Sequence, residues 1–397
     1  MAGMVLVREF EQGDIERVLD LVNGTFLGWG GSGEWLWKFK AAEAVNGRRP
    51  VVFVVEHRGA VVGHLGFIPM NVRVGGEVFQ SCQLVDGVLD VRYRGKGVYT
   101  RLVSAVLSKA KEENSSLIFG FANEAAFHNY SRHGDFLALC KLAKMFRTLS
   151  LRQILGSVRV RFVEKEAGQS GQSLPSRAGD SSKNPLISPV QVAKIIPVVG
   201  ASFLRHFFRR CLGSRGNGRA IEAKEDLRVV ETRDFGKIAK LSVGLLNRSS
   251  LVIERSSGFL RWRYSRPEVK YKFFVAEKSG VPLGYFIIGQ KERSISVGRV
   301  EFARLRIGYI MDLVSDTELA GQLLLKAEEE LKKQDSWVAQ FWTNEGSTTC
   351  DMLRMFGYDR LPGEVTMVVN AKEPACRETV LQNLESIMIS LGDTDHA

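Results

Sequence analysis

Cysteine is scarce in this sequence, and the spacing of its cysteines argues against two structural roles, metal binding and disulfide bonding. The 397 residues include five cysteines, which form no CxxC motif and have no histidine nearby at a metal-ligand spacing. These absences argue against a zinc site and against a disulfide framework. Most of the cysteines fall inside apolar runs, where a small buried side chain is expected. The five are Cys82, Cys140, Cys211, Cys350 and Cys376.

Long apolar runs are also missing. No stretch of about 18 apolar residues occurs, so no membrane-spanning helix is expected. The stretch MAGMVLVREFEQGD contains acidic residues and no apolar segment of signal-peptide length. With 45% hydrophobic and 25% charged residues, the composition is that of a soluble globular protein. We therefore expect a reduced, cytoplasmic protein with two domains and a connection.

The net charge of +11 comes mainly from one segment. Residues 151–220 contain twelve Lys or Arg against three Asp or Glu, so the flanking regions together contribute only +2. A basic connector therefore accounts for the charge, not a basic face on a folded domain. Nucleic-acid binding needs basic and aromatic residues interleaved on such a face, so no nucleic-acid partner is expected.

Residues 1–150 have the pattern of one α/β domain with a mixed sheet. Two strands meet at the hairpin signal Arg58-Gly59, and a helix with Asp14 as its N-cap lies upstream. The remaining elements alternate between short apolar strands and helices with one apolar stripe. The expected strands are 4–10, 51–57, 60–74, 78–91, 117–122 and 136–148, and the expected helices follow Asp14, cover 99–113 and begin near 123.

A connector over residues 151–225 follows, basic and partly disordered. Its composition between Gly168 and Pro189 is rich in Ser, Gly and Pro, which is typical of a mobile linker. Residues 190–212 mix apolar and basic side chains. Two interpretations are open for them: a helix packed on one of the domains, or weak contact with an anionic membrane surface.

Residues 226–372 repeat the order of elements of the first domain, and a polar tail over 373–397 ends the chain. Trp262-Arg263-Tyr264 corresponds to Trp37-Lys38-Phe39 upstream. A hairpin, a helix at 318–333, a strand at 337–342 and a further helix follow in the same order as before. This repetition predicts a tandem pair of one fold.

The most informative segment is a glycine loop between a strand and a helix, VRYRGKGVYT over 91–100. Two glycines separated by one residue let the backbone curl so that successive N–H groups point into one concavity. The following helix adds its free N–H groups and the positive end of its dipole. Such a cradle suits a pyrophosphate, although the spacing fits neither the Walker pattern nor the dinucleotide fingerprint.

In this loop the sequence resembles the GNAT N-acetyltransferase family, whose cofactor motif is Gln/Arg-x-x-Gly-x-Gly/Ala. The match is Arg94-Gly95-Lys96-Gly97-Val98-Tyr99, with Tyr99 in place of the usual small residue. A second match lies in the later helix, where the family has Asn-x-x-Ala-x-x-x-Tyr-x-x-x-Gly. Its members here are Asn123, Ala126, Tyr130 and Gly134. The resemblance covers most of residues 4–148 and recurs more weakly over 227–370.

The resemblance implies two tandem GNAT-like domains, each a mixed, mostly antiparallel twisted sheet flanked by helices. Acetyl-CoA or another acyl-CoA is the implied cosubstrate, with no metal, and it would lie where strands 83–91 and 117–122 splay apart. Backbone groups of Leu89, Asp90 and Val91 would pair with the pantetheine. Residues Arg94, Gly95, Lys96, Gly97, Val98 and Tyr99 would hold the pyrophosphate.

Direct attack of an amine on a thioester requires a proton acceptor for the amine and a proton donor for the leaving thiolate. The resemblance implies Tyr130 as the donor, against the alternative that it only packs on the sheet. Asn123 has two open roles, cofactor contact or helix cap. For the acceptor we expect Asp86, with Glu124 and His128 as alternatives.

Three tryptophans, Trp29, Trp35 and Trp37, lie where the family walls its acceptor pocket, and core packing is the competing explanation. The second repeat lacks the glycine loop and has Asp312, Asp316 and Glu318 instead. A carboxylate cluster repels pyrophosphate, so this half is expected not to bind CoA.

The expected function is N-acetyl transfer to a primary amine on a small molecule or peptide. The alternatives are a non-catalytic CoA-binding or scaffold protein, and a tandem-fold acyl or aminoacyl transferase of the cell-envelope type. The sequence leaves the acceptor, the acyl chain and the oligomeric state open.

Overall fold

The computed structural model describes most of the chain as two halves of similar construction. The described residues are 5–26, 29–43, 47–133, 135–162, 227–247, 249–297, 300–361, 363–371, 374–382 and 387–394. Gly134, the segment 190–212 and most of the connector lie outside them. We call residues 5–150 the first half and residues 227–394 the second half.

The first half contains the elements that the hydrophobic pattern predicts, with boundaries shifted by one or two residues. In α4, for example, one stripe of aliphatic side chains is buried against the sheet. The strands are β1 Leu6–Glu9, β2 Val51–His57, β3 Ala60–Val74, β4 Glu77–Leu89, β5 Leu117–Asn123 and β6 Leu137–Thr148. The helices are α1 Ile15–Thr25, α2 Ser32–Trp35 with a π-helical turn Leu36–Lys40, α4 Val98–Glu112 and α5 Glu124–His133.

The second half follows the same order. Its strands are β8 Leu227–Glu231, β9 Leu251–Ile253, β10 Lys270–Lys278, β11 Val281–Val297, β12 Val300–Ser315, β13 Val338–Asn344, β14 Asp359–Arg360, β15 Val365–Ala371 and β16 Ile387–Met388. Its helices are α8 Phe235–Leu246, α9 Ser257–Arg263, α10 Thr317–Lys333, α11 Thr348–Met355 and α12 Pro374–Gln382. The predicted architecture, a tandem of mixed, mostly antiparallel sheets flanked by helices, is therefore confirmed.

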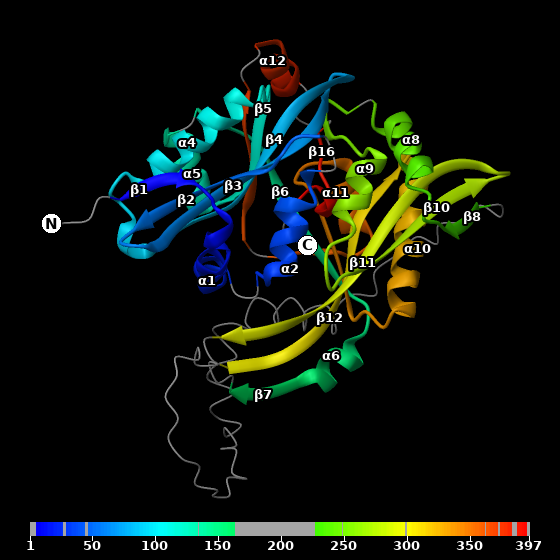
Figure 1. Cartoon of the computed structure of the whole chain (residues 1–397). Helices are drawn as coiled ribbons and strands as arrows, with labels where there is room; N and C mark the ends of the chain where they lie inside the picture. The colour runs from blue at the N-terminus through cyan, green and yellow to red at the C-terminus, as the bar shows by residue number, and fades with distance from the viewer. Residues whose placement is uncertain are drawn as a thin grey trace, which may run out of the picture.

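The two halves exchange a strand. The sheet runs β1-β2-β3-β4-β5-β15-β6-β13-β12-β11-β10-β8. Strand β15 of the second half pairs with β5 and β6, and β6 of the first half pairs with β13. The result is one continuous sheet across the molecule (Figure 1). Each half therefore completes the sheet of the other.

Helices cover the sheet in layers. Helices α4 and α5 cover one face of the first half, and α10 and α11 cover one face of the second (Figure 1). The opposite faces, with α1, α2, α8 and α9, share one large apolar core. At its centre Trp37 and Trp262 stack with ring centroids 5.7 Å apart, and each indole N–H donates to the other residue's carbonyl oxygen. The sequence correspondence between these tryptophans thus marks a contact that joins the halves.

Two segments, one after the first half and one at the end of the second, have more structure than the sequence pattern indicates. Residues 151–162, expected within the connector, form α6 Leu151–Ser157 and β7 Val158–Phe162, and β7 pairs with β12. Part of the expected polar tail is buried, with Ile387 and Leu391 in the shared core. Strand β16 and the residues that follow it up to Thr394 therefore lie near the middle of the molecule (Figure 1).

Asp14 is the N-cap residue of α1, as the sequence predicts, but its carboxylate makes no cap hydrogen bond to the helix. It is fully buried and accepts from both Nη atoms of Arg8, at 2.7 and 2.9 Å, and from the Glu11 N–H. The hydrogen bonds from Arg8 hold the pKa of Asp14 below its ordinary value.

Candidate functional site

The site is built around a gap between two parallel strands. Pairing of β4 with β5 runs from Ser81–Leu117 to Leu84–Gly120 and then ends. Beyond this point β4 is irregular, and its register with β3 shifts between His64 and Gly66. Asp86 lies at this irregularity with φ of +53°, a left-handed conformation that aspartate tolerates better than most residues. The predicted splayed pair is therefore present at the predicted strands.

The glycine loop follows directly at the end of β4. After a short 3-10 turn at Val91–Tyr93, Gly95 and Gly97 both have φ of +71°, and Gly97 is the N-cap residue of α4. Only glycine adopts this conformation without strain. Residues 94–97 are exposed, and Val98 beneath them is buried and anchors the helix. The N–H groups of the first turn of α4 thus face an open cradle.

Several polar groups around the loop are already bonded within the chain. Arg92 forms an exposed ion pair with Asp90, which lowers the pKa of Asp90 to about 2. The Leu89 carbonyl accepts from Arg94 Nε at 3.2 Å, and the Asp90 N–H donates to the Val62 carbonyl at 2.8 Å. Fewer backbone groups in the 89–91 stretch are therefore available to a ligand than the sequence indicates.

Two tyrosine hydroxyls lie at the gap, on the side covered by α4 and α5. Tyr99 reaches from the first turn of α4 and Tyr130 from α5, with their hydroxyl oxygens 3.4 Å apart. Burial raises the pKa of Tyr99. Tyr130 is 5% exposed and packs on Phe136. The Tyr130 ring thus packs in the core while its hydroxyl lies beside that of Tyr99, and its role as proton donor stays a prediction.

Asn123 ends β5, immediately before α5. Its Oδ1 atom accepts from the Ala126 N–H at 2.9 Å, which is the geometry of an N-cap. Of the two roles left open by the sequence, the capping role is the one that this contact fills.

Asp86 points to the opposite side of the sheet, toward α1 and α2. Its carboxylate is 2.8 Å from Lys38 Nζ, and both side chains are nearly buried, at 6% and 4% exposure. The Trp29 indole N–H donates to Asp86 Oδ1 at 2.9 Å. The His64 ring lies beside this pair, with Nδ1 2.8 Å from the Asp86 carbonyl oxygen, and burial lowers the pKa of His64. Because a carbonyl oxygen only accepts, His64 Nδ1 donates to it and bonds the strand at its irregularity.

Lys38 and His64 were not identified from the sequence as site residues. Lys38 stands between aromatic residues in a segment whose counterpart is Trp262-Arg263-Tyr264, so the repetition of a basic residue between aromatic ones was the available signal. His64 lies in an apolar strand without such a signal. Trp35 packs on Phe39 with centroids 4.3 Å apart, so it and Trp37 are core residues, whereas Trp29 contacts Asp86.

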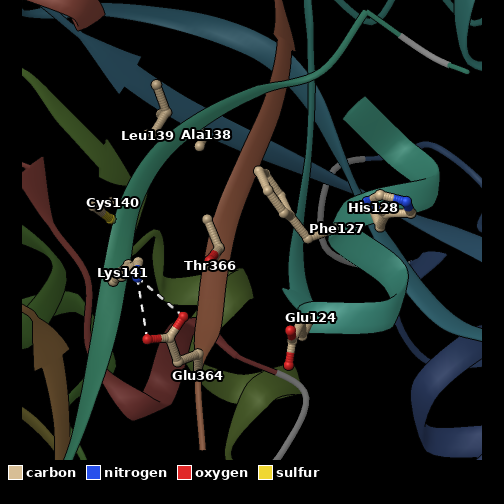
Figure 2. Close-up of a pocket in the computed structure, with 9 residues that line it drawn as sticks. All are labelled: Glu124, Phe127, His128, Ala138, Leu139, Cys140, Lys141, Glu364 and Thr366. Carbon is tan, nitrogen blue, oxygen red and sulfur yellow. Dashed lines mark hydrogen bonds and ion pairs between the residues drawn. The ribbon is translucent and has the colours of Figure 1, made fainter. Parts of the chain in front are cut away.

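Glu124 and His128 line a groove of about 950 Å³ between α5, β6 and the start of β15. Figure 2 shows them with Phe127 on one side and the ion pair of Lys141 with Glu364 on the other. Neither Tyr99 nor Tyr130 is among the residues that line this groove. The role of Glu124 and His128 as alternatives to Asp86 stays a prediction.

The second half has a corresponding gap, but the chain itself fills it. Pairing of β12 with β13 ends at Ile310 and Phe341. Beyond it, Ser390 bridges to Thr343 of β13, and a Cβ added to Gly392 would lie 3.1 Å from the Met311 carbonyl oxygen. The C-terminal segment 387–394 therefore lies between the diverging strands.

Buried charges hold this segment. Arg255 pairs with Asp312 and with Asp393 of the segment, each at 2.8 Å, and all three are almost fully buried. Arg263 donates to the carbonyl oxygens of Gly392 and Thr394. Asp312 is thus not part of an exposed carboxylate cluster with Asp316 and Glu318, as the sequence suggested. No glycine loop separates β12 from α10, which begins two residues after the strand ends.

The described ranges contain neither a metal-binding cluster of side chains nor a helix that could span a membrane. No group of three or more His, Cys, Asp or Glu within them could hold a metal ion. None of the helices in the described part of the chain is long and apolar enough to cross a membrane.

The chain resembles acyltransferases in part of its sequence and in its fold. A model of the acetyltransferase (GNAT) domain matches residues 6–135. No curated protein sequence matches the chain. Three solved structures with the same fold are each 12% identical to it. A probable N-acyltransferase from Enterococcus faecalis has a TM-score of 0.54, with 96% of this chain and 74% of that chain covered.

Two further structures extend this resemblance. A GCN5-related N-acetyltransferase from Anabaena variabilis has a TM-score of 0.53 over 94% of this chain and 74% of that chain. Saccharomyces cerevisiae N-myristoyltransferase with bound myristoyl-CoA has a TM-score of 0.57 over 97% of this chain and 89% of that chain. At this identity the likeness concerns the fold, and it extends over both halves.

Proposed function

Residues 6–135 match a model of the GNAT acetyltransferase domain, and on that premise we propose that the chain transfers an acetyl group from acetyl-CoA to a primary amine. The observation that carries the proposal is the exposed glycine loop at the end of β4, where the strand has separated from β5. An open set of helix N–H groups beside a strand gap fits a long anionic thioester.

Different residues of the loop and of the end of β4 fit different chemical groups of the cofactor. Gly95 and Gly97 turn the backbone so that the N–H groups of 96–99 can bond pyrophosphate oxygens. Lys96 and Arg94 add positive charge at the exposed rim. Backbone groups of Leu89, Asp90 and Val91 are the proposed contacts for the pantetheine. A bound acyl-CoA supplies the activated acyl group, and the remaining chemistry belongs to the chain.

Tyr130 is the proposed proton donor. In the reaction, the amine nitrogen bonds to the acyl carbon, the carbon–sulfur bond breaks, and its electron pair stays on sulfur. The Tyr130 hydroxyl proton goes to that sulfur. The amine nitrogen loses its proton to Asp86 through water, and solvent returns a proton to the Tyr130 oxygen. A phenol is mostly protonated at neutral pH because its ordinary pKa is about 10.

Asp86 is the proposed acceptor of the amine proton, through water. Direct contact is disfavoured because the carboxylate is already paired with Lys38 and bonded to Trp29. Its position on the face of the sheet opposite Tyr99 and Tyr130 supports entry of the amine from that face and of CoA from the other. Separate entry from two faces lets both substrates bind before the reaction occurs.

The second half is proposed to shape the acceptor side and not to bind CoA. Two observations support this: its gap contains the segment 387–394, and it has no glycine loop. The shared apolar core places α9 of the second half against the π-helical turn that follows α2, through Trp37 and Trp262. The acceptor is a primary amine on a small molecule or a peptide.

Turnover tests the proposal. The protein is incubated with acetyl-CoA and a panel of amines, thiol release is followed by absorbance, and the acetylated amine is identified by mass spectrometry. We expect Tyr130→Phe to lower kcat by about 10²-fold or more while acetyl-CoA binding is retained. Tyr309→Phe is the matched control, since it removes another buried phenol in the second half.

Two outcomes would favour other functions. Tight acetyl-CoA binding without turnover of any amine would indicate a non-catalytic CoA-binding or scaffold protein. Acyl or aminoacyl transfer without CoA binding would indicate a transferase of the cell-envelope type.

A further inference from the structure

Tyr99 occupies a position where the family motif has a small residue, and its side chain reaches the strand gap. It is the second residue of α4, directly after the glycine loop. The side chain lies over the sheet beside Tyr130, with ring centroids 6.4 Å apart. The large residue therefore bridges the loop and the proposed proton donor.

Gly87 shows how closely the two hydroxyls approach β4. A Cβ added to Gly87 would lie 2.5 Å from the Tyr99 hydroxyl oxygen and 3.4 Å from that of Tyr130. Gly87 is not among the glycines with positive φ, so the space taken by Tyr99, not the backbone conformation, favours glycine here. Both hydroxyls thus converge on β4 three residues past its last pair with β5.

We propose that Tyr99 is a positioning residue that directs the Tyr130 hydroxyl proton toward the leaving sulfur, an inference that rests on the proposed acetyl transfer. The Tyr99 O–H donates to the Tyr130 oxygen at 3.4 Å. That oxygen therefore accepts from Tyr99, and the Tyr130 proton points to another acceptor. When Tyr130 gives its proton to sulfur, the same hydrogen bond shortens onto the phenolate and stabilises it.

The inference is tested first by titration of the free protein. Tyrosine labelled with ¹³C in the ring is followed by NMR between neutral and alkaline pH, and Tyr130→Phe assigns the Tyr130 signal. Loss of a hydrogen bond to the phenolate raises a phenol pKa, so Tyr99→Phe should move the Tyr130 titration to higher pH. Tyr93→Phe is the control, because its hydroxyl also lies beside the loop but bonds His57 Nδ1 at 2.6 Å.

The second readout is kinetic. Tyr99→Phe should lower kcat by about ten- to a hundredfold, the loss expected for one hydrogen bond to a charged group, with little change in the acetyl-CoA KM. In the Tyr130→Phe background the same change should have no further effect. An unchanged Tyr130 titration together with a wild-type kcat in Tyr99→Phe would overturn the inference.

A third experiment tests the geometry separately from the chemistry. Gly87→Ala places a methyl group against the Tyr99 hydroxyl and should lower the melting temperature, whereas Gly87→Ala with Tyr99→Phe should recover most of the loss. Equal losses in both backgrounds would contradict the placement of Tyr99. If the wild type acetylates no amine, the proposed function fails, while the titration and the Gly87 pair still report whether the two hydroxyls are coupled.

Discussion

Replacing Asp86 with asparagine removes the negative charge from the buried ion pair that Asp86 forms with Lys38. The two side chains are 4% and 6% exposed and 2.8 Å apart. Breaking a buried pair by removal of one partner costs about 3–5 kcal/mol, because the remaining charge stays desolvated. We therefore expect Asp86→Asn to lower the free energy of unfolding by about this amount.

A double variant separates stability from chemistry. Removing both charges of a buried pair is often neutral, so Asp86→Asn with Lys38→Met should return close to wild-type stability. If Asp86 accepts the amine proton, the stable double variant should still be slower than the wild type by about 10²-fold or more.

Urea unfolding followed by tryptophan fluorescence measures the first effect, and thiol release from acetyl-CoA measures the second. Trp29 is a useful reporter because its indole N–H donates to Asp86. Wild-type stability of Asp86→Asn alone would refute the energetic reasoning. Full activity of the stable double variant would refute the proposed role of Asp86 in proton transfer.

Three further predictions concern the two halves and the N-terminal region. Saturating acetyl-CoA should protect β4, the glycine loop and α5 from hydrogen exchange; protection confined to β12 and α10 would contradict the assignment of the cofactor to the first half. Arg255→Met should lower the free energy of unfolding in urea by about 3–5 kcal/mol, because it leaves Asp312 and Asp393 buried without a cation; an unchanged urea midpoint would show that the segment 387–394 is not held by these pairs. Because the folded-state pKa of Asp14 is lowered, its contribution is fully present above about pH 4 and is lost as the pH falls through the folded-state value. Asp14→Asn should therefore flatten the acid part of the stability profile, and an unaltered profile would argue against the Arg8 pairing.

Local features of the site were predictable from the sequence because they depend on neighbouring residues. The pair Gly95 and Gly97 between an apolar strand and an amphipathic helix indicates a cradle of N–H groups without knowledge of the rest of the chain. Strand β4 and helix α4 were placed within one or two residues for the same reason.

Long-range pairing was not predictable in the same way. The exchange of β6 and β15 depends on which strand edges meet. The apolar pattern of β15 would be the same whether the strand paired within its own half or with the other half. The ion pair of Lys38 with Asp86 joins residues 48 positions apart. The segment 387–394 looked like a polar tail because its buried polar groups are bonded by Arg255 and Arg263 from another part of the chain.

The central claim is that the glycine loop of the first half holds acyl-CoA, and isothermal titration of acetyl-CoA tests it most directly. Gly97→Glu adds backbone strain at φ of +71° and a negative charge in the cradle. Gly280→Glu is the matched control, since Gly280 has φ of +77° with no atom near its added Cβ and lies in a hairpin of the second half.

We expect micromolar binding to the wild type and to Gly280→Glu, and no binding to Gly97→Glu. Equal binding by both variants would remove the loop from the site, and no binding to the wild type would contradict the account.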